Sequence, residues 1–173
     1  MTKKPEPMIV NTESAPTESP DTAANSLSFA TTEPDINTWL KEAKNDPRSS
    51  YVGMYLTHNG VVRATPKQVV RPNEQSSAGS AALPVIAVDF SYNKQGLEQA
   101  IQDALTWKGI YYVRVWLNEG VIPVGGSLMY VLIGADIRPN AVEALTKLVG
   151  HIKNDLVSEI EIYDSQTKES LDE

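Results

Sequence analysis

The amino-acid sequence predicts an α+β domain in which helices pack on a mixed β-sheet, flanked by disordered termini. Two observations predict this class. Apolar residues recur with helical spacing in some segments and alternate or run continuously in others, so helices and strands follow one another along the chain. In addition, 41% of the 173 residues are hydrophobic, which is enough to fill one core.

Polar segments divide the chain into a disordered leader (residues 1–33), a folded domain (34–163) and an acidic disordered tail (164–173). The leader and the tail are poor in large apolar side chains, so burial cannot offset the entropy that they would lose on ordering. Inside the domain, the polar and proline-containing stretch 65–82 lies between two strand-like segments. A stretch of this length and composition predicts a mobile loop.

The first helix is predicted near the start of the domain and ends before Pro47. Residues 51–58 are β-prone and lead into Asn59-Gly60. This dipeptide is the strongest local signal for a tight hairpin, but it also fits a bulge in one longer strand, and the sequence leaves both open. The apolar positions of the helix have i, i+3, i+4 and i+7 spacing: Ile36, Trp39, Leu40 and Ala43.

Two further helices alternate with strands in the rest of the domain. One is indicated by Leu97, Ile101, Ala104 and Leu105 and ends at Gly109, and a longer one begins near Pro139. The remaining strands are expected at residues 84–92, 110–118, 128–135 and 158–163. The strand at 128–135 is almost continuously apolar, so we expect both of its faces to be buried.

Charge and residue types exclude several functional classes. The net charge of −7 comes from the two ends, and the nearly neutral part between them argues against nucleic-acid binding by a basic surface. No apolar run reaches the ~18 residues that a membrane helix needs, and no secretory signal follows Met1, so we expect a cytoplasmic protein. Without cysteine there is no thiolate for catalysis or metal binding.

No familiar catalytic motif is present, whether a Walker loop, a dinucleotide fingerprint or a Gly-x-Ser-x-Gly elbow. His58 and His151 have no second ligand at metal spacing, and we interpret them as ordinary side chains at a strand end and on a helix surface. The glycine-rich residues 124–127 precede a strand, which favours a tight turn over a phosphate loop. No metal and no cofactor are therefore predicted.

Three basic residues form the candidate site. Arg63 ends an apolar segment before the polar loop, and Arg138 lies between the buried strand and the long helix. An arginine in such a place can bind phosphate or carboxylate bidentately. Lys153 lies among apolar neighbours, where a lysine can lose its proton and become a nucleophile. Taken singly, each residue is more often an ordinary surface charge.

Several short motifs occur in a fixed order over about residues 36–162. They are Gly60-Val61-Val62-Arg63, residues 118–125, Ile137-Arg138, Ala141-Val142-Glu143-Ala144 and Ile152-Lys153. In order and spacing these motifs resemble the large, catalytic subunit of molybdopterin synthase, the MoaE family.

The resemblance implies an α/β hammerhead-type fold, a homodimer and a small ubiquitin-like sulfur-carrier partner with a Gly-Gly C-terminus. The family takes sulfur from the thiocarboxylate of that C-terminus and transfers it to cyclic pyranopterin monophosphate during molybdenum cofactor (molybdopterin) biosynthesis. By motif position, Arg63 and Arg138 would bind the phosphate and pyran oxygens of this pterin substrate. Lys153 would act at the thiocarboxylate.

The sequence also departs from the family. Ile137 stands where the family has histidine, and Ile160 stands at its second catalytic lysine. The neighbouring Glu159 and Glu161 would repel an anionic pterin if they face it, and would cost little if they face solvent. We favour a sulfurtransferase, and the alternative is a non-catalytic MoaE-like protein that binds the pterin or the partner.

Overall fold

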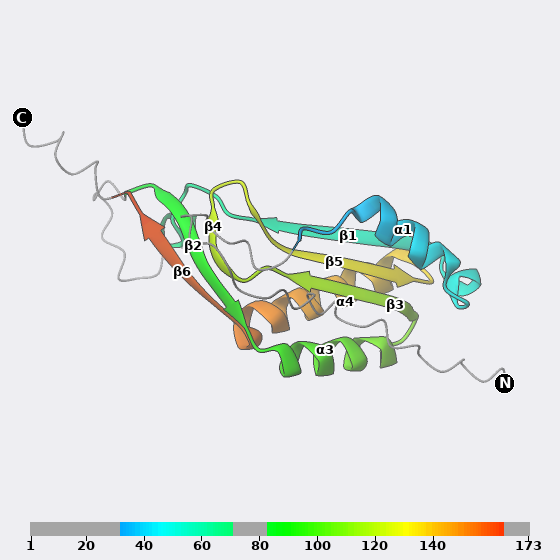
Figure 1. Cartoon of the computed structure of the whole chain (residues 1–173). Helices are drawn as coiled ribbons and strands as arrows, with labels where there is room; N and C mark the ends of the chain where they lie inside the picture. Colours follow the sequence, from blue (N-terminus) through cyan, green and yellow to red (C-terminus); the bar gives the residue numbers. More distant parts are fainter. Residues whose placement is uncertain (1–31, 71–82, 165–173) are drawn as a thin grey trace, which may run out of the picture.

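Two three-stranded antiparallel sheets form the frame of the fold (Figure 1). The computed structural model describes residues 32–70 and 83–164. Sheet A has the order β1-β5-β3, with β1 at Met54–Val61, β5 at Ser127–Ala135 and β3 at Ile110–Leu117. Sheet B has the order β4-β2-β6, with β4 at Gly120–Pro123, β2 at Val85–Tyr92 and β6 at Val157–Tyr163.

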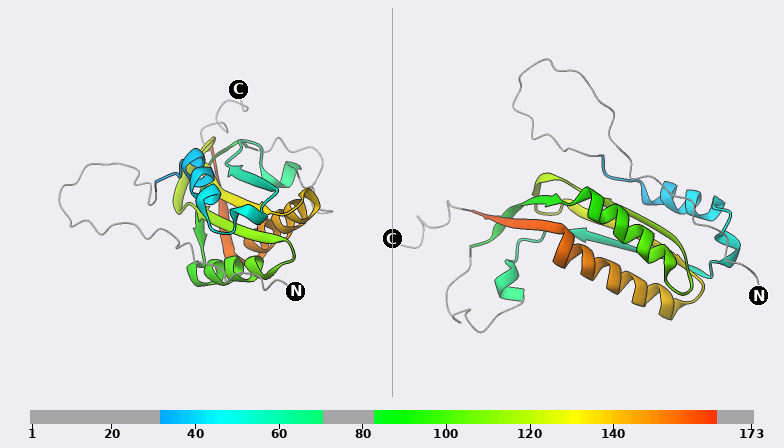
Figure 2. Two further views of the ribbon diagram at one scale, coloured as in Figure 1. Left: turned by 90° about the vertical axis from the view of Figure 1, so that its right-hand side faces the viewer. Right: turned by 90° about the horizontal axis from the view of Figure 1, so that it is seen from below.

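Helices cover both faces of sheet A (Figure 2). Helices α3 (Lys94–Thr106) and α4 (Arg138–His151) lie side by side on one face, and α1 (Ile36–Asn45) lies on the other. Successive side chains of the central strand β5 therefore pack against different helices. Val131 and Ile133 belong to the main core, whereas Leu132 packs with Trp39 of α1. The prediction that this strand is buried on both faces is confirmed.

The helix starts have local chemical causes. The Asp35 carboxylate accepts hydrogen bonds from the amides of Asn37 and Thr38 at the start of α1. The Asn93 side chain accepts one from the Gly96 amide at the start of α3.

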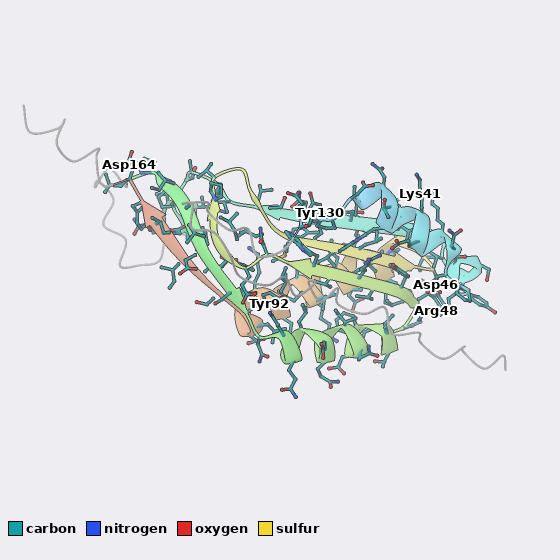
Figure 3. All side chains as sticks on the ribbon, in the orientation of Figure 1. Lys41, Asp46, Arg48, Tyr92, Tyr130 and Asp164 are labelled. Atoms are coloured by element: carbon teal, nitrogen blue, oxygen red, sulfur yellow. The ribbon has the colours of Figure 1, made fainter. Side chains whose placement is uncertain are left out.

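The turn with Asp46 and Arg48 after α1 lies at one end of the molecule and Asp164 at the other (Figure 3).

Sheet B extends away from the helices and exposes its outer face. Val88, Phe90 and Ile122 of its inner face belong to the main core. On the outer face, Asp89 pairs with Val121 on one side and with Ile160 on the other. Ile160 is 61% exposed, so this position of β6 faces away from the core.

The predicted α+β class with helices packed on sheet is confirmed. In detail, the strands form two antiparallel sheets where we expected one mixed sheet. The reason lies in the helical connections: α3 links β2 of sheet B to β3 of sheet A, and α4 links β5 of sheet A to β6 of sheet B. Each crossover therefore changes sheet, and neither creates a parallel pair within one sheet.

At Asn59-Gly60 the chain forms a bulge and not a hairpin. β1 continues through this dipeptide along β5, and its register shifts between Gly60 and Val61. Three short elements were not predicted: the 3₁₀ helix η1 (Ser49–Tyr51), β4 and the four-residue helix α2 (Lys67–Val70). Helix α2 falls inside the stretch 65–82 that we interpret as a mobile loop, of which residues 71–82 lie outside the described residues.

The predicted leader and tail lie almost wholly outside the described residues, which begin at Thr32 and end at Asp164. Of the leader, Glu33 is described and accepts hydrogen bonds from Ser127 Oγ at 2.7 Å and from Tyr130 Oη at 2.6 Å. The start of α1 is therefore tied to β5 of sheet A.

Candidate functional site

The junction between α4 and β6 places Lys153 beside sheet B. A single π-helical segment, η2 (Ile152–Leu156), follows α4 and passes directly into β6. Such wide turns in helices are often found at functional sites. Ile152 is fully buried and fixes the segment in the core, while the Lys153 side chain is 40% exposed. The Lys153 Nζ lies 3.6 Å from Glu159 Oε1.

Glu159 connects this lysine to a second one. It projects from β6 toward the inner side of the sheet, where its side chain is only 10% exposed. Its Oε2 pairs with Nζ of Lys67 from α2, and the Lys67 amide donates a hydrogen bond to Glu161 Oε1 at 2.9 Å. We call Lys67, Lys153, Glu159 and Glu161 the lysine–glutamate cluster.

Electrostatics keep Glu159 ionised in this position. Burial by itself would raise the pKa of Glu159, but the hydrogen bond from Lys67 and the charges of Lys153 and Lys67 lower the pKa overall. The carboxylate is thus held as an anion between two ammonium groups.

His58 adjoins the cluster from β1. Its Nε2 is buried and has no hydrogen-bond partner among the described residues. Burial lowers the pKa of His58, and the charge of Lys153 lowers it further, so the neutral imidazole is favoured. The interpretation of His58 as an ordinary strand-end side chain leaves out this electrostatic contact with Lys153.

The structure does not bring all three predicted site residues together within one chain. Arg63 is exposed, donates a hydrogen bond from Nε to the Thr65 carbonyl at 3.0 Å, and lies four residues before Lys67. Arg138 begins α4, whereas Lys153 follows its end. A rise of ~1.5 Å per residue separates these two residues by roughly 20 Å along the helix.

The positions that depart from the MoaE motifs face different ways. Ile137 and Ile160 are 55% and 61% exposed. Glu159 and Glu161, in contrast, both contact Lys67. The two carboxylates therefore lie beside Lys153 and Lys67 and not on the exposed outer face of sheet B.

Other features of the described residues do not add to this site. A cavity of about 400 Å³ lies between the end of α3 and the first turns of α4, against Trp107, Asn140 and Lys147. It contains none of Arg63, Arg138 and Lys153. Residues 32–70 and 83–164 contain no group of three His, Cys, Asp or Glu side chains that could hold a metal ion. None of their helices has the length and apolar character needed to cross a membrane.

Sequence reasoning missed Lys67 as a site residue. It lies in the polar stretch 65–82, and its contact with Glu161 spans 94 residues of sequence. The only signal was the alternation of Glu159 and Glu161 in the last strand, which places both on one face without saying which face is inside.

Structural comparison places the chain among known folds, whereas sequence comparison finds no matching family model and no curated relative. The chain is similar to a MoaE protein from Burkholderia ambifaria, with a TM-score of 0.52 and 15% identity over 82% of this chain and 95% of that one. It is also similar to molybdopterin synthase from Staphylococcus aureus, with a TM-score of 0.51 and 14% identity over 66% of this chain and 77% of that one.

A third similar structure is a complex of subunits 1 and 2 of molybdopterin-converting factor from Helicobacter pylori. Its TM-score is 0.51, and it is 15% identical over 77% of this chain and 86% of that one. These likenesses show that the chain has the MoaE-like fold, in a divergent form, and confirm the fold that the motifs imply.

Proposed function

We propose that this chain acts in molybdenum cofactor biosynthesis as a sulfurtransferase of the molybdopterin synthase type. In this proposal, sulfur passes from the thiocarboxylate of a small ubiquitin-like partner ending in Gly-Gly to cyclic pyranopterin monophosphate. The supporting observation is that Lys153 lies in a polar cluster at the α4–β6 junction of a MoaE-like fold. The two-subunit complex among the similar structures supports a small partner.

Lys153 is suited to meet the thiocarboxylate because its side chain is partly exposed while its segment is fixed in the core. Its ammonium group can bind the thiocarboxylate anion by a charge-assisted hydrogen bond. Arg63, on the connection that leads to Lys67, is assigned to the pterin phosphate.

Arg138 requires a second copy of the chain. Since it lies roughly 20 Å from Lys153 along one helix, it can join the same site only from another subunit. The proposal therefore includes a homodimer in which Arg138 of the partner subunit faces Lys153.

The test is an assay with purified protein, a thiocarboxylated partner and the pterin precursor. Molybdopterin should form, and Lys153→Ala and Arg138→Ala should each abolish its formation. A mixture of the two variants, unfolded and refolded together, should recover about a quarter of the activity, because half of the dimers are mixed and each has one intact site. No product from the wild-type chain, with precursor binding demonstrated, refutes the sulfurtransferase.

One observation favours the second candidate, a non-catalytic protein that binds the pterin or the partner. Lys153 is paired with Glu159, and position 160 carries no amine and faces the opposite side of β6. Calorimetry that shows binding of the pterin or of the small partner, with no product in the assay above, supports this candidate.

A further inference from the structure

Two lysines from distant parts of the chain meet at one buried carboxylate. Lys67 comes from α2 and Lys153 from η2, and their ammonium groups approach different oxygens of Glu159. Two ammonium groups repel each other, and the carboxylate that both of them contact offsets this repulsion.

We propose that Lys67 and Lys153 form a two-lysine site for a carboxylate-type monoanion, with Glu159 as the residue that positions both ammonium groups. Only the identity of the natural ligand, the C-terminal group of the small partner, rests on the proposed function. If that function holds, Lys67 binds this group together with Lys153.

Both lysines retain hydrogen-bonding capacity for an external anion. An ammonium group has three N–H donors. The Lys67 ammonium donates to Glu159, and the Lys153 ammonium lies 3.6 Å from Glu159 Oε1, so each ammonium group has N–H donors left for a ligand. The two lysine side chains are 50% and 40% exposed, against 10% for Glu159, so a ligand can reach the lysines without entering the core.

Two buried polar atoms lie beside the lysines. Glu159 Oε1 is buried and is paired with the Lys153 ammonium at 3.6 Å, and His58 Nε2 is buried without a hydrogen-bond partner among the described residues. A carboxylate oxygen accepts and does not donate, so Glu159 positions the lysines and does not itself bind the anion.

The charge of the cluster selects a monoanion over a phosphate dianion. The positive charges of Lys67 and Lys153 are balanced by Glu159 and Glu161, and the favoured form of His58 is neutral. For a dianion both the attraction to the lysines and the repulsion from the carboxylates double, so a balanced cluster gives it no net electrostatic gain, while it loses more hydration on binding than a monoanion does. A single terminal carboxylate or thiocarboxylate fits the balance better.

The test uses a short peptide ending in Gly-Gly as its free acid, the same peptide as its C-terminal amide, acetate and inorganic phosphate. Binding to the full chain is measured by NMR of labelled lysine side chains and by calorimetry. The free acid should shift the signals of Lys67 and Lys153, acetate should shift them more weakly, and the amide should leave them unchanged. Lys67→Gln should weaken binding of the acid about tenfold, the scale of one charge-assisted hydrogen bond, and Lys67→Arg should restore most of it.

Lys94→Gln is the matched control. Lys94 also pairs with a glutamate, Glu119, at 3.4 Å, but its side chain is 68% exposed and lies outside the cluster. Binding of the acid should change less than about twofold in this variant. Equal effects of Lys67→Gln and Lys94→Gln, or tighter binding of phosphate than of the acid, overturn the two-lysine site.

The outcomes for the site and for the function are separable. Lysine-dependent binding of the acid without any sulfur transfer leaves the two-lysine site intact and refutes the enzyme. Sulfur transfer that is unaffected by Lys67→Gln refutes the role of Lys67 and leaves the enzyme intact.

Discussion

Substitution of Gly109 by alanine tests how the end of the fold that carries Arg138 is held together. Gly109 joins α3 to β3 with a φ of +74°, a left-handed conformation that costs ~1–2 kcal/mol for a residue with a side chain. An added Cβ would lie 2.3 Å from Asn140 Nδ2 and 2.4 Å from Asp136 Oδ1. These neighbours cannot move freely, because Asn140 Nδ2 donates a hydrogen bond to Asp136 Oδ1 and the Asp136 amide donates one to the Gly109 carbonyl.

Two other glycines separate the backbone cost from the crowding. Gly120 also has positive φ (+95°), but nothing lies within 4 Å of an added Cβ. Gly150 lies within α4 without positive φ and with the same open surroundings. Gly120→Ala should therefore destabilise by ~1–2 kcal/mol, and Gly150→Ala should stabilise by ~0.5–1 kcal/mol.

Gly109→Ala should carry the backbone cost and a further ~1–3 kcal/mol for overpacking, about 2–5 kcal/mol in total. Urea unfolding of the three variants at one pH gives the free energies of unfolding, provided that the slope with denaturant stays unchanged. If Gly109→Ala destabilises no more than Gly120→Ala, the crowding between Gly109, Asp136 and Asn140 does not exist in solution.

Four further predictions concern the cluster and the helix on the opposite face. The pKa of Glu159 in the folded state is lowered from its ordinary value of 4.5. Ionised Glu159 therefore stabilises the folded state above pH 4.5, and this contribution is lost as the pH falls through the folded-state pKa. Glu159→Gln should remove this part of the acid dependence of the free energy of unfolding measured in urea. Ile160→Lys places its amine on the outer face of β6, so it should change stability by less than about 1 kcal/mol and yield no gain in the molybdopterin assay. Trp39→Ala removes a side chain that is 4% exposed and lies 4.5 Å from the Arg114 guanidinium, so thermal and urea unfolding should show a loss of about 3–5 kcal/mol. The double variant Lys67→Met/Glu159→Met should unfold with unchanged or higher free energy and should lose binding of the Gly-Gly acid in calorimetry.

Much of the fold could be predicted because the longer elements carry a clear hydrophobic period. The spacing of Trp39 and Ala43 indicates α1, and the continuous apolar run of β5 indicates a strand between two layers of helix. The missed elements, η1, β4 and α2, have three or four residues each, which is too short for either period to show. Whether a helical connection stays within one sheet or changes sheet depends on packing between distant segments, and no local pattern encodes it.

The candidate site was less predictable, and Glu159 shows why. The usual expectation for a strand with Glu159 and Ile160 in alternation is that isoleucine faces the core and glutamate faces water. In β6 the order is reversed, with Glu159 10% and Ile160 61% exposed. The charge of the inward-facing Glu159 is balanced by Lys153 and by Lys67, which comes from a segment far away in sequence. Lys153 was predicted from its motif, but its partners could not be.

The energetics of the cluster bear on whether it serves stability or binding. A carboxylate that is as buried as Glu159 loses most of its hydration, and two ammonium groups that remain about half exposed return only part of that free energy. The cluster therefore adds little stability over methionine pairs of similar volume, which also explains the expected result for Lys67→Met/Glu159→Met. What the charged version does supply is two ammonium groups fixed near each other and open to solvent. If the double variant were to lose several kcal/mol of stability, the cluster would instead be a structural ion pair, and the two-lysine site would lose its main physical support.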